Sequence, residues 1–218
     1  MRMLYRKERE DLCKVVKTMF DRFETNAAGG NVSVRMNENH IIMTPTLMSQ
    51  AKHCDLQPEE ILVVDMQEQK IEGDGKITRE INMHMACYRE RSDIGCVLHA
   101  HPKESMVFAT IGMDLPNLTE ATQKLGQIPV LPFAPATSME LALIVKEYVA
   151  SLKEEAIPKT MLLNKHGILV LDKTLRKAYD MLERVEYNAY VAAKALIFDA
   201  LNIKKMDENK EYQFNLEE

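Results

Sequence analysis

The sequence predicts an α/β protein in which helices flank a central, mostly antiparallel sheet, so that the fold has three layers. Segments with helical spacing of apolar residues are mixed along the chain with short segments of alternating polarity. No G-x-G-x-x-G motif follows the first strand, which disfavours a doubly wound nucleotide-binding fold. The chain has 218 residues and no internal repeat. We therefore expect one domain over residues 1–218, with a polar tail from about residue 207 that is only loosely held.

Composition excludes several classes of protein. The net charge is −5 and no run of basic residues occurs, so a nucleic-acid partner is not expected. No apolar stretch approaches the roughly 18 residues of a membrane span, and the N-terminus lacks the apolar core of a signal peptide. The four cysteines are widely scattered, which favours free thiols in a reducing cytoplasm: Cys13, Cys54, Cys87 and Cys96.

In the first half of the chain, helical spacing of Leu12, Val16 and Met19 predicts a helix over residues 8–23. Short strands and polar connections follow. The predicted segments are strands at 32–34, 40–43 and 61–64, a polar loop at 50–60 and a turn at 72–75.

In the second half, Thr78 is a good N-cap for a helix that places Ile81, Met85 and Tyr88 on one stripe. A buried strand at 96–98 follows it. The remaining predicted segments are a helix at 103–111, an extended piece at 128–133, a helix at 139–152, two strands within 161–171 joined at Lys165-His166-Gly167, and a helix at 174–201.

Two histidines stand at the end of the strand at 96–98, in the run His99-Ala100-His101-Pro102. Alternate residues of a strand project to the same face, so His99 and His101 are expected to lie together. Neutral imidazole is the commonest protein ligand of transition metals. The simpler alternative is one core histidine and one solvent histidine, because H-x-H is a short pattern.

Other polar residues have two interpretations each. Gly29, Gly30 and Asn31 precede a strand, where they form either a plain turn or a backbone cradle for an anion. Glu80 lies in the first turn of its helix, where a carboxylate also favours the helix dipole. His166 is exposed at its bend unless a ligand draws it inward. We expect His40 and His53 at the surface, and His84 packed in its helix or, less simply, in contact with Glu80.

Taken together, separated motifs resemble the class II aldolase/adducin family over about residues 8–200. They are Gly29-Gly30-Asn31-Val32-Ser33-Val34-Arg35, Thr44-Pro45-Thr46, Thr78-Arg79-Glu80 with His84, His99-Ala100-His101-Pro102 and Asn164-Lys165-His166-Gly167. That family contains fuculose-phosphate aldolase, ribulose-phosphate 4-epimerase, methylthioribulose-phosphate dehydratase and sugar-acid decarboxylases. The resemblance implies a helix-covered sheet, a divalent metal and a homotetramer with active sites between subunits.

The resemblance also implies roles for particular residues. His99, His101 and His166 correspond to metal ligands, and Glu80 to a carboxylate that ligates the resting metal and then acts as acid and base. Three neutral nitrogen ligands suit catalytic Zn²⁺, although Mn²⁺, Co²⁺ and Fe²⁺ also accept them. The positions that correspond to the family's substrate phosphate site are Gly30, Asn31, Thr46, Leu47, Thr78 and Arg79.

The chain departs from the family pattern at two of those positions. Leu47 replaces a glycine of the backbone cradle, and Arg79 adds a planar, permanently charged group that could clamp a phosphate or a carboxylate, or else be solvated. Glu120 corresponds to an acid/base residue that reaches the site of a neighbouring subunit, or is a plain surface residue. Tyr212 in the tail corresponds to a C-terminal tyrosine that closes over the site.

The function that the resemblance implies is retro-aldol cleavage of a small ketose 1-phosphate to dihydroxyacetone phosphate and an aldehyde. The metal would act as a Lewis acid for the enediolate left by cleavage, and Glu80 would move the proton. The alternatives are epimerisation, dehydration or decarboxylation of a related sugar phosphate through the same enediolate, or a non-catalytic adducin-like module. Retention of three histidines and Glu80 counts against the module.

Overall fold

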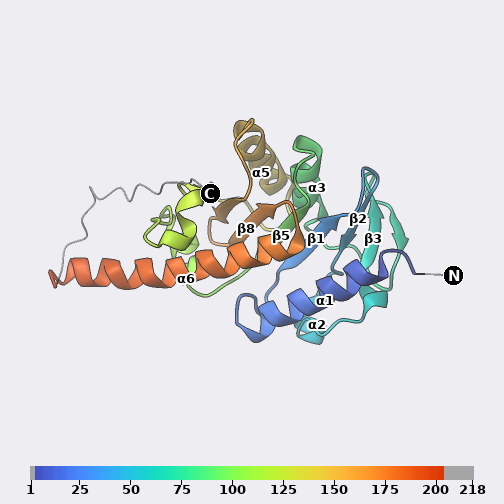
Figure 1. Ribbon diagram of the computed structural model, residues 1–218, viewed down its shortest axis with the longest axis horizontal. Helices are drawn as coiled ribbons and strands as arrows, with labels where there is room; N and C mark the ends of the chain where they lie inside the picture. Colours follow the sequence, from blue (N-terminus) through green and yellow to red (C-terminus); the bar gives the residue numbers. More distant parts are fainter. Residues whose placement is uncertain (1–2, 204–218) are drawn as a thin grey trace, which may run out of the picture.

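An eight-stranded sheet forms the middle layer of the protein in the computed structural model, which describes residues 3–203 (Figure 1). The strand order is β4-β3-β2-β1-β5-β8-β7-β6, and every neighbouring pair is antiparallel except β6 and β7, which are parallel. The strands are β1 Asn31–Arg35, β2 His40–Met43, β3 Leu62–Asp65, β4 Lys70–Glu72, β5 Cys96–Ala100, β6 Val130–Leu131, β7 Lys159–Leu163 and β8 Gly167–Asp172.

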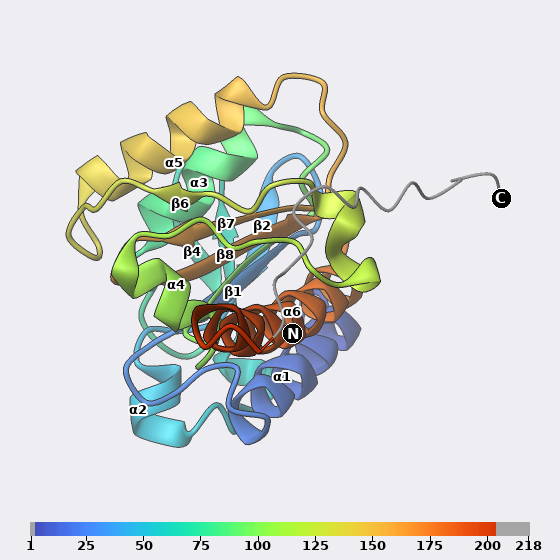
Figure 2. The ribbon, with the colours of Figure 1, turned by 90° about the vertical axis from the view of Figure 1, so that its left-hand side faces the viewer.

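Helices cover both faces of this sheet, which confirms the predicted three-layer architecture (Figure 2). One core contains side chains of α1 Arg6–Asp21, α2 Met48–Lys52, α4 Ser105–Ile111 and α6 Leu175–Ala200. The other contains side chains of α3 Ile81–Glu90 and α5 Met139–Ser151. Two 3₁₀ segments, η1 Pro58–Glu60 and η2 Glu120–Leu125, lie in the connections. No helix within residues 3–203 is long and apolar enough to cross a membrane.

Strand β5 shows how the sheet divides its side chains between the two cores. Cys96, Leu98 and Ala100 pack on the side of α1 and α6, whereas Val97 packs on the side of α3 and α5. Because alternate residues of a strand share a face, His99 lies on the same face as Val97 and points toward α3. Full burial of each large apolar side chain stabilises the fold by about 1.5–3 kcal/mol, so this alternation fixes the register of β5 firmly.

Most of the predicted segments are present, and the differences are confined to short elements. The loop predicted at 50–60 contains the end of α2 and all of η1, and neither β4 nor η2 was predicted. β4 is an edge strand in which Lys70 and Ile71 are exposed, so its sequence carries no alternation of buried and exposed residues. The extended piece at 128–133 is reduced to β6, which pairs in parallel with β7.

The prediction that Thr78 caps α3 is wrong. The N-cap is Glu80, without a side-chain cap, and α3 begins at Ile81. Residues 78–80 instead form a turn, in which the Ile81 amide donates to the Thr78 carbonyl and the Glu80 amide reaches the Thr78 hydroxyl at 3.4 Å. This turn holds Glu80 just before the first residue of α3. The predicted tail from residue 207 and Tyr212 lie outside the described residues.

Candidate metal centre

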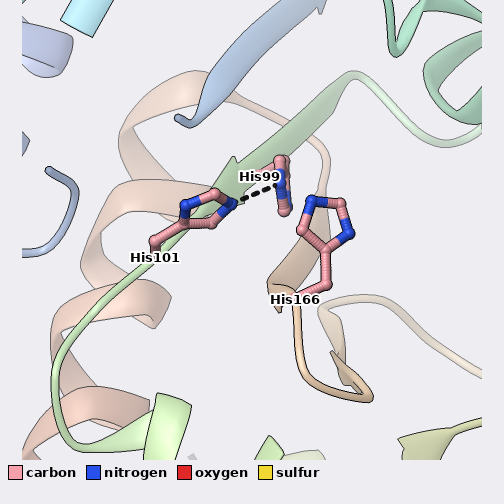
Figure 3. Close-up of side chains that lie close together, drawn as sticks. All are labelled: His99, His101 and His166. Atoms are coloured by element: carbon pink, nitrogen blue, oxygen red, sulfur yellow. Dashed lines mark hydrogen bonds between the residues drawn. The ribbon is translucent and has the colours of Figure 1, made fainter. Parts of the chain in front are cut away.

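Three histidines, from the end of β5 and from the turn before the neighbouring strand β8, lie close together (Figure 3). His99 is the fourth residue of β5, His101 follows that strand, and His166 lies in the turn between β7 and β8. The pairing of Ala100 with Ile168 brings the turn beside the end of β5. The expectation that His99 and His101 lie together is confirmed, since their ring centroids are 4.8 Å apart.

A close approach of backbones makes this meeting possible. A Cβ atom at Gly167 would lie 2.5 Å from the carbonyl oxygen of Ala100, 2.7 Å from Cδ2 of His101 and 2.9 Å from Cε1 of His99. Only glycine therefore fits there without moving β8 away from β5. The glycine that follows His166 in the sequence is thus a steric requirement of the histidine cluster.

The three imidazoles can bind a single cation. One ligand nitrogen from each ring lies within 4.8 Å of the other two, and Nε2 of His101 is 3.0 Å from Nε2 of His99. The centroid of the His166 ring lies 4.7 Å from that of His99 and 5.3 Å from that of His101. These distances are those expected for three side chains that surround one binding position for a cation.

The protonation state of the histidines favours metal binding. Burial lowers the pKa of His99 to about 4 and that of His101 to about 3, so both rings are neutral at pH 7. Nδ1 of His99 lies 3.0 Å from the carbonyl oxygen of Ile168, which can only accept, so Nδ1 carries the proton. Nε2 of His99 is consequently left with a free lone pair directed into the cluster.

Glu80 completes the cluster from the start of α3. Its Oε2 lies 3.4 Å from Nε2 of His99 and its Oε1 lies 3.2 Å from Nε2 of His166. Burial acts to raise the pKa of this carboxyl, but the charge interactions with His99 and His166 and a hydrogen bond from Asn31 outweigh burial and lower the pKa well below its usual range. Glu80 is therefore ionised at neutral pH.

These donors fit a divalent metal. A lone pair on His99 faces both an ionised carboxylate and a second imidazole, an arrangement that repels unless a positive charge lies between them. Oε1 of Glu80 and Nδ1 of His166 are buried and have no hydrogen-bond partner within the described residues. Three nitrogens and one carboxylate are a usual ligand set for zinc and other first-row metals.

A cavity of about 150 Å³ opens beside the cluster, and every residue predicted to bind substrate lines it. Three loops form its wall, at residues 27–31, 45–50 and 78–80, together with Ala136 and Thr137 from the connection after β6. The predicted residues in this wall are Gly30, Asn31, Thr46, Leu47, Thr78, Arg79, Glu80, His101 and His166.

Two residues give the cavity an unusual wall. Leu47 has φ 60° and a side chain that is 53% exposed, so it holds a left-handed conformation that glycine adopts more readily. The guanidinium of Arg79 is exposed and has no hydrogen-bond or ion-pair partner in residues 3–203, which leaves its charge available to an anion. Gly30 has φ +113°, and its position also requires glycine.

Glu120 is not part of this cluster in the single chain. It is exposed at the start of η2 and does not line the cavity. The loop before it is nevertheless held firmly, because Oδ1 of the buried Asn188 accepts hydrogen bonds from the amides of Leu118 and Thr119, and its Nδ2 donates to the carbonyl of Pro116. The structure therefore presents Glu120 outward on a fixed support.

Some residues at the site carry no sequence signal that identifies them. Thr137 reaches the cavity from a distant connection, and Ser49 lines it while donating to the carbonyl of Gly29. Their neighbourhood depends on how the loops fold together, which periodicity does not encode. Of the two histidines expected at the surface, His53 is exposed against Phe20, whereas His40 is half-buried and hydrogen-bonded to Tyr5.

Comparison with known proteins now decides the family. The profile described as the Class II Aldolase and Adducin N-terminal domain matches residues 10–193. The chain belongs to the class II aldolase and adducin family. The match covers all three histidines, Glu80 and the loops of the cavity, as the resemblance of the motifs predicts.

Individual members of the class II aldolase family differ in reaction. A protein named L-fuculose phosphate aldolase from Methanococcus vannielii is 32% identical over 191 residues, which cover 87% of this chain and 98% of that protein. A protein named 3-oxo-tetronate 4-phosphate decarboxylase from Haemophilus influenzae is 26% identical over 189 residues, covering 84% and 85%. Among solved structures, an L-fuculose 1-phosphate aldolase superposes with a TM-score of 0.79 at 26% identity, covering 91% of this chain and 89% of that one.

Proposed function

We propose that the protein is a divalent-metal-dependent lyase that cleaves a small ketose 1-phosphate to dihydroxyacetone phosphate and an aldehyde. The observation that carries this proposal is the meeting of three imidazoles with the ionised Glu80 at the wall of a cavity. The similarity to proteins named L-fuculose phosphate aldolase supports the same reaction class.

His99, His101 and His166 would hold the metal, with Glu80 as a further ligand in the resting enzyme. Zn²⁺ suits this set best, and Mn²⁺, Co²⁺ or Fe²⁺ would also bind. When bound, a divalent ion supplies Lewis-acid stabilisation of the negative charge that develops on the substrate oxygens.

Glu80 would move the proton, and its two oxygens have different tasks. Oε2 accepts a hydrogen bond of 2.8 Å from Nδ2 of Asn31. Oε1 has no such donor, so it is the oxygen that takes up and returns a proton. Removal of the hydroxyl proton beyond the breaking C–C bond releases the aldehyde. The electrons of that bond remain on the carbon next to the carbonyl, and a returned proton completes dihydroxyacetone phosphate.

The substrate phosphate would bind in the cavity opposite the histidines. Gly30 allows the backbone to approach an anion closely, while Thr46 and Thr78 add hydroxyl groups and Arg79 adds a charge without an internal partner. Leu47 also lines this part of the wall, with an exposed side chain on a left-handed backbone. We therefore assign the phosphate to the loops at residues 30–31, 46–47 and 78–79.

We infer a homotetramer whose active sites lie between subunits, with Glu120 contributing acid/base chemistry to the site of a neighbour. The family resemblance supports this arrangement. The exposed position of Glu120 on a loop fixed by Asn188 also supports it, because a side chain held outward so firmly can meet a second copy without reordering.

Arg79 favours a second candidate reaction. A planar guanidinium pairs with a carboxylate through two parallel hydrogen bonds, so a sugar-acid phosphate would also fit the cavity and could undergo decarboxylation. Epimerisation and dehydration proceed from the same kind of enediolate. A non-catalytic module is disfavoured, since a scaffold has no use for a buried set of metal ligands.

A screen of ketose 1-phosphates and sugar-acid phosphates separates these reactions. The purified protein is loaded with Zn²⁺, and dihydroxyacetone phosphate and CO₂ are measured for each compound. We expect dihydroxyacetone phosphate from at least one ketose 1-phosphate. Release of CO₂ alone would assign the decarboxylase reaction, and full turnover by metal-stripped protein would contradict both.

Two broader properties accompany this proposal. The four cysteines are buried and free, which supports a reducing compartment, and we propose that the protein is cytoplasmic. One sheet supports both hydrophobic cores and the family match spans residues 10–193, so we propose a single domain.

A further inference from the structure

A chain of buried polar side chains extends from Glu80 into the core between β1 and α3. Asn31 and Ser33 occupy alternate positions of β1, while Glu80, His84 and Tyr88 are spaced by four residues at the start and along α3. The exposed fractions are 8% for Glu80, 5% for Asn31, 2% for Tyr88 and 0% for His84 and Ser33. Every second residue of a strand shares a face, and so does about every fourth residue of a helix. The five side chains therefore lie in one row between β1 and α3.

Hydrogen bonds connect every member of this row. Nδ2 of Asn31 donates to Oε2 of Glu80 at 2.8 Å, and Oδ1 of Asn31 contacts Nε2 of His84. Nδ1 of His84 lies 2.6 Å from Oγ of Ser33, which lies 2.9 Å from the hydroxyl of Tyr88. The row is therefore continuous from the candidate ligand to the core.

The chemistry of the groups fixes the direction of each bond. An ionised carboxylate only accepts, so Asn31 must turn its NH₂ toward Glu80 and its oxygen toward His84. That oxygen also only accepts, so Nε2 of His84 carries a proton. Burial lowers the pKa of His84 to about 4, which keeps the ring neutral and leaves Nδ1 as an acceptor for Ser33. Ser33 in turn accepts from Tyr88.

We propose that His84 is a positioning residue that orients the side-chain amide of Asn31 and thereby holds Glu80 at the metal centre. Without the N–H of His84, the Glu80 carboxylate alone would favour this orientation of the amide, and the buried Oδ1 of Asn31 would lose its donor. The reversed amide would set its oxygen against Oε2 of Glu80, and repulsion would move the carboxylate away from His99 and His166. The inference rests on the proposed function of Glu80 and adds a residue that touches neither metal nor substrate.

Two substitutions at His84 separate positioning from simple packing. His84→Leu fills much of the same volume but removes both hydrogen bonds. His84→Gln retains an amide donor for Asn31 and a carbonyl acceptor for Ser33. We expect His84→Leu to lose about 10- to 100-fold in Zn²⁺ affinity and in kcat, as is typical for residues that support metal ligands, and His84→Gln to recover most of both. KM should change less than kcat, because Thr46, Thr78 and Arg79 of the phosphate loops do not contact His84 and only the Asn31 amide is disturbed.

Zn²⁺ affinity is measured by competition with a chromophoric chelator, which requires no substrate. His40→Leu is the matched control, since His40 is also hydrogen-bonded but does not line the cavity, and it should leave affinity and kcat unchanged. Circular dichroism confirms that each variant is folded. Equal Zn²⁺ affinity and kcat in His84→Leu and the unaltered protein would overturn the positioning role.

A measurement on the unaltered protein covers the case in which His84→Leu does not fold. Long-range ¹H–¹⁵N correlation spectra of ¹⁵N-histidine-labelled protein report the tautomer of His84, assigned by the loss of its signals in His84→Gln. We expect the neutral Nε2–H form between pH 6 and 9. An Nδ1–H form or an imidazolium would overturn the proposal. If instead Glu80→Gln retained full turnover, the proposed function would fail whatever the state of His84.

Discussion

At the scale of single residues, the site depends most on His99, which lies inside β5 and is fully buried. His99→Ala removes one of the three proposed nitrogen ligands, the ring whose Nδ1 proton is fixed by the carbonyl of Ile168. We expect the purified variant to contain less than a tenth of the metal bound by the unaltered protein and to have no measurable turnover. Metal content by atomic emission and the rate of product formation check this, and a fully loaded variant would contradict it.

Glu80→Gln tests proton transfer separately from metal binding. The amide retains an oxygen for the hydrogen bond from Asn31 but cannot take up and return a proton, the role proposed for Oε1. We expect the variant to keep its metal and to lose about 10²- to 10⁴-fold in kcat, the usual contribution of general acid–base catalysis. An unaltered kcat would remove Glu80 from this role.

Arg79 tests the charge of the cavity. Hydrogen bonds to charged groups contribute about 1.5–3 kcal/mol, so Arg79→Gln should raise KM for a phosphorylated substrate about 10- to 100-fold with a smaller effect on kcat. Arg79→Lys keeps the charge without the planar fork and should bind a phosphate better than a carboxylate. Steady-state kinetics on both substrate types would show whether Arg79 is solvated and idle, in which case KM would not change.

Sequence reasoning predicted the side chains that meet in the cluster well and the residues that support them poorly. His99 and His101 were predictable because strand periodicity places them on one face, and the family resemblance added His166 and Glu80. The support for Glu80 was only partly predictable, since His84 reaches it through Asn31, a residue 53 positions away along the chain. A hydrogen bond between a strand and a helix depends on their packing, which local spacing does not determine.

At the scale of elements, the junction of α1 with α6 contains an unusual buried carboxyl. Burial, reinforced by the nearby Glu183, raises the pKa of Glu24 from 4.5 to about 7, against the opposing effects of Tyr179 and Arg22. Arg22 also pairs with Glu183 at 2.6 Å, so its charge is shared. Glu24 directly precedes the loop that carries Gly29 and Gly30. Ionisation of its carboxyl therefore destabilises the folded protein close to the cavity.

The pH dependence of stability follows from the direction of this shift. The folded protein holds the proton of Glu24 up to about pH 7 and the unfolded chain loses it near 4.5, so ionisation weakens the fold as pH rises through this interval. Glu24→Gln removes the effect. We expect it to be more stable than the unaltered protein by about 3 kcal/mol at pH 8 and equal at pH 4.5. Urea unfolding at both values checks this, and a pH-independent difference would contradict it.

The elements also show where prediction from sequence ends. The long amphipathic helices and the strands with buried residues on alternate positions were predictable, because burial imposes a period. The start of α3 was not, since Thr78 is a better cap by residue type than Glu80. The turn at residues 78–80 instead presents Glu80 to the histidines, and its hydrogen bonds satisfy the backbone there.

At the scale of the whole molecule, the placement of Glu120 leads to a prediction about assembly. If its carboxyl completes the site of another copy, the protein must be oligomeric wherever it is active. We expect a solution mass near four times 25.0 kDa at micromolar concentration, measured by light scattering after size-exclusion chromatography. A monomer that retains full activity would contradict a shared site, and Glu120→Gln would then leave kcat unchanged.

The sheet order has a consequence for how the centre could move. β5 is flanked by β1 and β8 along its length, so His99 is anchored by hydrogen-bonded neighbours on both sides. His166 belongs to a hairpin tip and Glu80 to the tip of a helix. Any opening of the coordination shell to admit a substrate should therefore come from these two tips. Amide hydrogen exchange should be slowest along β5 and faster at residues 78–80 and 164–166. That pattern is expected if the hairpin tip and the start of α3 move while β5 stays in place.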